Sequence, residues 1–108
     1  MVVIVFRSRL REDIDMAGLD ALGAEMAAIA TAMPGFLSYK DYAAADGELL
    51  TVVEFESEET LAAWRDDPAH RAAQERGRRE FFAEYRIQIC TPVRAYRFDL
   101  AGGRQQLL

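Results

Sequence analysis

Two stretches of the chain are apolar at nearly every position, and they restrict the possible folds more than any other feature. Residues 2–6 read Val-Val-Ile-Val-Phe, and residues 49–55 read Leu-Leu-Thr-Val-Val-Glu-Phe. Runs rich in β-branched residues and without strict alternation are typical of strands buried on both faces. A fold for this chain must therefore cover both faces of the sheet that holds these strands.

A helix is predicted after the first strand, which continues to Leu10. Asp13 or Asp15 is its candidate N-cap, because a short acidic side chain accepts hydrogen bonds from the first free backbone N–H groups. Pro34-Gly35 ends the helix, since proline cannot continue it. The helix presents one apolar stripe with spacings of three and four residues, formed by Leu19, Leu22, Met26, Ile29 and Met33.

The middle of the chain predicts a β-hairpin followed by two helices. Strands over 36–44 and 49–55 flank Ala-Asp-Gly-Glu, in which Asp-Gly suits the positive φ angles of a tight turn. Ser57 caps a short helix, and Asp67-Pro68 starts a second one that runs from 69 to about 82. Residues 85–90 then alternate as a strand, and a last strand covers 93–98 after Pro92.

The resulting order, β-α-β-β-α-β with an extra carboxy-terminal strand, predicts an α+β domain of the ferredoxin-like type over residues 1–99. Such a domain has an antiparallel sheet with its helices on one face. Because two strands are apolar on both faces, the uncovered face needs a second layer, and a second copy of the chain supplies it. We therefore expect a homodimer, a dimeric α/β barrel, with residues 100–108 as a flexible tail.

Composition excludes several classes of protein. The chain has 108 residues and a net charge of −5, which argues against a nucleic-acid partner. One cysteine and one histidine leave no disulfide framework, cysteine zinc site or multi-histidine metal site. No apolar run is long enough to span a membrane, and the first residues do not resemble a signal peptide, so a cytoplasmic location is expected.

Charge is unevenly distributed along the chain. Residues 1–60 carry 4 basic and 12 acidic side chains, whereas residues 61–108 carry 9 basic and 6 acidic ones. Surface helices whose net charges differ in sign would explain this uneven distribution. Alternatively, the arginines line a site for an anionic or polarised ligand.

Several short segments together resemble the antibiotic biosynthesis monooxygenase family over residues 1–98. They are Met33-Pro-Gly-Phe36, the hairpin after it, Trp64 followed by Pro68-Ala-His70, and Phe81-Phe82 followed by Tyr85. The resemblance implies the dimeric α/β-barrel fold. One branch of this family oxygenates polycyclic anthrones to quinones without a cofactor, and another branch degrades haem.

The resemblance also implies pocket residues. Trp64 matches a helical tryptophan of both enzymatic branches, and Ser8 stands where they have an asparagine, a residue absent from this chain. The haem-degrading branch has its iron-ligating histidine ten residues after the tryptophan, where this chain has Gln74. Glutamine is a poor haem ligand, so neither haem nor another cofactor is expected.

Candidate site residues follow from their chemistry. His70 has the pKa range of a general base, Trp64 offers a ring for stacking on a flat substrate, and an arginine stabilises a developing oxyanion. Each has a structural alternative: His70 as a helix-surface residue or dimer contact, the aromatic residues as core, and Arg9 or Arg86 as partners of Glu54. The catalytic candidates are His70, Trp64 and Arg9, and the candidates for substrate binding are Ser8, Phe36, Tyr39, Gln74, Phe81, Tyr85 and Arg86.

These observations favour an enzyme that oxygenates a small aromatic substrate, such as a phenol, hydroquinone or anthrone, with O₂ and without metal or flavin. A non-catalytic dimeric barrel, either binding a small ligand or purely structural, is the alternative. An isomerase or cyclase acting on a polyketide-like ring would use the same pocket without O₂.

Overall fold

The computed structural model describes residues 1–108, and a four-stranded antiparallel sheet in the order β2-β3-β1-β4 is its centre. Its strands are β1 (Val2–Leu10), β2 (Phe36–Ala43), β3 (Leu49–Phe55) and β4 (Phe82–Cys90). The two strands that contain the apolar runs, β1 and β3, are the inner pair. This inner position suits their β-branched side chains, which pack against side chains of both neighbouring strands.

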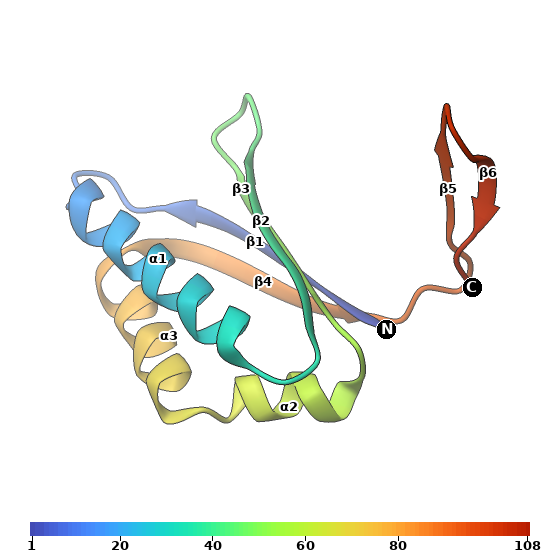
Figure 1. The fold of residues 1–108 in the computed structure, drawn as a ribbon. Coiled ribbons are helices and arrows are strands. Elements are labelled where there is room, and N and C mark those ends of the chain that lie inside the picture. Colours follow the sequence, from blue (N-terminus) through green and yellow to red (C-terminus); the bar gives the residue numbers. More distant parts are fainter.

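Three helices, α1 (Met16–Ala32), α2 (Glu58–Arg65) and α3 (Pro68–Glu80), pack against one face of the sheet (Figure 1). The predicted ferredoxin-like α+β fold is confirmed by this arrangement. Local chemistry sets the helix starts: Ser57 and Thr60 form a reciprocal capping box, and the Asp67 side chain accepts from the backbone of Ala69. At the start of α1, Asp15 is the N-cap residue, but its side chain makes no capping hydrogen bond.

The strand register decides which side chains face the helices. Ile4 lies opposite Val53 of β3 and Ile89 of β4, and this row faces the helices. Val5, one residue later, lies opposite Val52 on the uncovered outer face. Because successive side chains alternate, even-numbered residues of β1 point inward and odd-numbered residues point outward.

The core lies between the helices and one end of the sheet. One buried cluster joins α2 to the inner strands and contains Val2, Ile4, Ala30, Val53, Phe55, Leu61 and Trp64. Phe55 is fully buried, and burial of a phenylalanine contributes about 1.5–3 kcal/mol to stability. A second cluster of Leu22, Ala73 and Phe81 fixes α1 against α3 at the other end of the helical layer.

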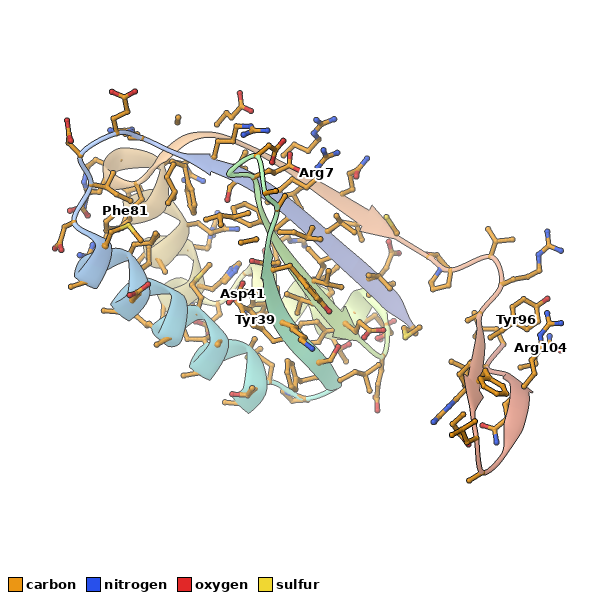
Figure 2. The ribbon with its side chains drawn as sticks, turned by 90° about the horizontal axis from the view of Figure 1, so that it is seen from above. Arg7, Tyr39, Asp41, Phe81, Tyr96 and Arg104 are labelled. Carbon is orange, nitrogen blue, oxygen red and sulfur yellow. The ribbon has the colours of Figure 1, made fainter.

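The carboxy-terminal residues form a separate hairpin of β5 (Tyr96–Asp99) and β6 (Gly103–Gln106), which stands away from the main sheet (Figure 1). Its strands include part of the segment that we expected as a flexible tail. The guanidinium of Arg104 lies 4.5 Å from the centre of the Tyr96 ring (Figure 2). No helix of the chain has the length and apolar character needed to cross a membrane.

Candidate functional site

A cavity of about 960 Å³ lies between the helices and the helix-facing side of the sheet. Its volume is at the upper end of the range for small-molecule pockets, roughly 300–1,000 Å³. Ile4, Phe6 and Ser8 contribute to its lining from β1, because all three point toward the helices. Most of the lining side chains are apolar, so the cavity suits a largely apolar molecule.

Trp64 and His70 form part of one wall of this cavity. Trp64 is at the end of α2 and His70 is in the first turn of α3, and the short connection between these helices brings the rings together. The ring centroids are 4.2 Å apart, and Trp64 also stacks on Phe55 of β3 at 5.4 Å. Asp67 fixes the start of α3 by accepting from the backbone N–H of His70 at 3.2 Å.

Both rings are buried, with 6% of Trp64 and 3% of His70 exposed. Neither the indole Nε1 of Trp64 nor Nδ1 of His70 has a hydrogen-bond partner. Burial lowers the pKa of His70, although the Arg65 backbone and the charge of Asp67 oppose this effect. His70 is therefore mainly neutral at pH 7, and unpaired polar atoms of this kind are uncommon in protein interiors.

Polar side chains also line the cavity from β2 and β3. Asp41 accepts a hydrogen bond from the hydroxyl of Thr51 at 2.6 Å. Burial, and secondarily the charge of Asp41, raises the pKa of Tyr39 to about 12. The Tyr39 phenol thus stays protonated at neutral pH, and it can donate a hydrogen bond but cannot act as a tyrosinate base. Figure 2 shows Tyr39 and Asp41 along β2.

Phe6, Phe82 and Tyr85, which we call the aromatic cluster, line the cavity on its β1–β4 side. Their ring centroids are 5.3–5.9 Å apart in tilted and edge-to-face pairs. Arg78 of α3 donates to the Tyr85 hydroxyl at 3.2 Å. A positive charge therefore lies at the edge of an otherwise apolar surface.

The comparison with protein families decides the identity of the domain. The family model described as "Antibiotic biosynthesis monooxygenase" matches residues 1–76. This chain belongs to that family. The match covers β1 to most of α3 and therefore includes both Trp64 and His70.

One protein of similar sequence and two solved structures of similar fold are the following. The uncharacterized protein YqjZ of Bacillus subtilis is 33% identical over 64 residues, which span 59% of this chain and 56% of YqjZ. Rv0793 of Mycobacterium tuberculosis has a TM-score of 0.73 and 24% identity, covering 85% of this chain and 94% of that chain. SnoaB, a cofactor-independent oxygenase from Streptomyces nogalater, has a TM-score of 0.72 and 16% identity, covering 92% and 95% of the respective chains.

Six of the predicted site residues meet at the cavity in this family member. They are Ser8, Tyr39, Trp64, His70, Gln74 and Tyr85. His70 and Gln74 share a face of α3 because they are four residues apart, as their spacing predicted. Ser8, at the position where the resemblance implied an asparagine in both enzymatic branches, is 4% exposed and offers a hydroxyl to the cavity.

The other four predicted residues lie elsewhere. Arg9 and Arg86 point to the outer face, because they occupy strand positions of the opposite parity to Ser8 and Tyr85. Arg9 is bound to Asp46 at 2.9 Å. The expected partner Glu54 lies at the far end of β3 and accepts from Ser38 at 2.6 Å instead.

Phe36 and Phe81 are packing residues rather than parts of the cavity lining. Phe36 packs edge to face on Phe55 at 5.9 Å, within the first core cluster. Phe81 is 2% exposed and belongs to the second cluster, beside α1 (Figure 2). When aromatic residues are this frequent in a sequence, the sequence alone does not show which of them line a cavity and which are packed in the core.

The residues present do not fit the haem of the haem-degrading branch. Gln74 occupies the position of its histidine ligand, and the amide is a poor ligand for iron. The one histidine, His70, is 3% exposed and its ring packs against Trp64. The residues of this cavity therefore do not provide a haem site.

Sequence reasoning missed Arg78 and the pair of Asp41 and Thr51. Arg78 is four residues after Gln74, so the helical period placed it on the same face as His70. In the sequence, Arg78 cannot be distinguished from the other arginines of residues 61–108, some of which form surface ion pairs, such as Arg76 with Glu80 and Arg79 with Glu75. Asp41 and Thr51 become visible only through the pairing of β2 with β3.

Proposed function

We propose that the chain is a cofactor-independent monooxygenase that acts in this cavity on a small aromatic substrate with O₂. The observation that carries the proposal is His70: a buried, neutral imidazole whose Nδ1 is unpaired, set against Trp64 in the cavity wall. An imidazole in this state can accept a proton without first losing another partner. Family membership and the fold similarity to SnoaB, a cofactor-independent oxygenase, support the same function.

The chemistry needs a substrate that yields a stabilised carbanion, such as the methylene of an anthrone. His70 removes one proton, and the carbanion reduces O₂ by forming a C–O bond, which gives a peroxide anion. The imidazolium returns its proton to form a hydroperoxide. Loss of the second C–H proton then breaks the O–O bond, so that the methylene and O₂ become a ketone and one water. Trp64 and the aromatic cluster hold the ring, and Tyr39 and the Trp64 N–H are the available hydrogen-bond donors for the developing oxyanion.

Oxygen uptake with dithranol, a simple anthrone, tests this proposal. We expect O₂ consumption that matches quinone formation in a ratio of one to one. His70→Gln should lower kcat by about 10²–10⁴-fold, the usual contribution of a general base, and Trp64→Phe should mainly raise KM. Arg79→Gln is the matched control, because Arg79 is on the same helix but pairs with Glu75 on the surface. Equal rates for wild type and His70→Gln would overturn the assignment of His70.

Anaerobic incubation separates the alternative functions. Product formation without O₂ would instead identify an isomerase or cyclase. Stabilisation of the folded state by aromatic compounds, without any turnover, would identify a binding protein.

We also propose that the outer face of the sheet forms a homodimer. Val3, Val5, Leu50 and Val52 form a half-buried apolar row there, and a structural relative from Thermobifida fusca is described as a dimeric ferredoxin-like protein. Sedimentation should give about twice the chain mass of 12.2 kDa. Val5→Lys should give the monomer, whereas Ala28→Lys, an exposed position on α1, should not; a monomeric wild type would contradict the proposal.

A further inference from the structure

One face of α3 carries three polar residues along the cavity. His70, Gln74 and Arg78 are spaced four residues apart, and all three line the cavity. A helix rises 1.5 Å per residue, so neighbouring members of this row are about 6 Å apart and its ends are about 12 Å apart. Burial decreases along the row, from buried His70 through half-buried Gln74 to exposed Arg78. The Arg78 end of the row, which is the end exposed to solvent, is called the opening below.

Arg78 differs from the arginines beside it in having no carboxylate partner. Arg76 pairs with Glu80 at 2.7 Å and Arg79 pairs with Glu75 at 3.3 Å, whereas the hydrogen bond of the Arg78 side chain goes to the Tyr85 hydroxyl. That bond turns the guanidinium toward the aromatic cluster. The positive charge at the opening is therefore not neutralised by the protein.

We infer that the substrate is an aromatic carboxylic acid, whose carboxylate binds Arg78 and Tyr85 while its ring lies on the aromatic cluster. This inference rests on the proposed function, since the reacting carbon would lie toward His70. The planar guanidinium fork matches a carboxylate, and one arginine with one hydroxyl balances a single negative charge rather than the two of a phosphate. The distance of about 12 Å along α3 suits a ligand of two or three fused rings.

Binding of 2-naphthoate and its neutral isostere 2-naphthamide tests the inference, with the intrinsic fluorescence of Trp64 as the signal. We expect wild type to bind the acid about tenfold more tightly than the amide, because hydrogen bonds to a charged group contribute more than neutral ones. Arg78→Gln should remove this preference by weakening the acid alone, and Tyr85→Phe should reduce it. Arg79→Gln should retain it.

Several results would overturn the inference: equal binding of the two probes by wild type, a preference that survives Arg78→Gln, or binding of neither probe. The preference should also fall as salt rises, because Arg78 is exposed to solvent. The outcome is separable from that of the proposed function. A carboxylate preference without oxygen uptake, either with dithranol or with an anthrone that carries a carboxylate, would keep the assignment of Arg78 and remove the oxygenase. Oxygen uptake without the carboxylate preference would keep the oxygenase and remove the assignment of Arg78.

Discussion

The rings of Trp64 and His70 lie 4.2 Å apart at an angle of 42°, and this contact links the core to the cavity. Trp64 belongs to the largest buried cluster, while His70 supplies an unpaired ring nitrogen beside it. The stability of α2 and α3 therefore fixes the orientation of the candidate base. A change in the charge of His70 should be measurable through its neighbour.

Trp64 should report the protonation of His70 by fluorescence. Trp64 is the one tryptophan in the chain, and a protonated imidazole in contact with indole quenches its emission. Because burial lowers the pKa of His70, emission should decrease at a midpoint below 6.5 as the solution is acidified. His70→Gln should abolish the step, and a midpoint at or above 6.5 would contradict the burial argument.

The same lowered pKa makes folding stability depend on pH. The unfolded chain binds a proton on this histidine near pH 6.5, whereas the folded chain binds it only at lower pH. Between these values the unfolded state holds more protons, so the free energy of unfolding falls as the pH drops below 6.5. Urea denaturation at a series of pH values should show a weaker decline for His70→Gln than for wild type. Parallel curves would show that His70 does not contribute.

Tyr39 should ionise only in strongly alkaline solution, since its pKa is raised to about 12. Titration of tyrosine absorbance should show a late step that Tyr39→Phe removes. The folded state holds this proton more tightly than the unfolded chain, in which tyrosine titrates near pH 10, so this stabilisation is lost as the pH rises from about 10 to about 12. If Tyr42→Phe removed the late step and Tyr39→Phe did not, the late step would belong to Tyr42, and the prediction for Tyr39 would be wrong.

Gly77 and Gly23 should respond in opposite directions to replacement by alanine. A Cβ at Gly77 would lie 2.6 Å from the Phe82 ring, whereas one at Gly23 would meet nothing within 4 Å. Gly23→Ala should therefore stabilise the protein by about 0.5–1 kcal/mol through helix propensity. Gly77→Ala should destabilise it by about 1–2 kcal/mol, because crowding exceeds that gain.

Thermal and urea unfolding of the two glycine variants provide the measurement. Because Phe82 lines the cavity, Gly77→Ala should also weaken binding of aromatic probes. Gly23→Ala is the control for stability alone, since Gly23 also lines the cavity. Stabilisation by Gly77→Ala would mean that the Phe82 ring moves aside without cost.

The fold could be predicted from sequence because its determinants are local. The limits of β3 at Leu49–Phe55 follow from one apolar run, and Ser57 and Asp67 cap helices at the positions their side chains indicate. Helical spacing predicted that His70 and Gln74 share a face, and the family resemblance implied that Trp64 belongs to the pocket. His70 is a candidate base because its ring is buried and its Nδ1 is unpaired. Both properties depend on how the surrounding elements pack, so they could not be predicted from the sequence.

The arginines show where sequence reasoning fails. The chemistry of Arg9 suits an oxyanion, but a strand places neighbouring residues on opposite faces, and the sequence does not state which face the helices cover. Arg78, on an amphipathic helix, resembled an ordinary surface residue. Only the three-dimensional path of β4 brings the Tyr85 hydroxyl to it.

The carboxy-terminal hairpin and the main sheet should differ in their local stability against unfolding. β5 and β6 pair only with each other, and an isolated two-stranded ribbon is marginally stable in water. Its amide protons should therefore exchange with solvent through local opening, at a free energy far below that of global unfolding, whereas those of β1 should exchange only when the whole sheet unfolds. Within one chain, amide hydrogen exchange should thus be slow in the main sheet and fast in the hairpin segment that follows Pro92.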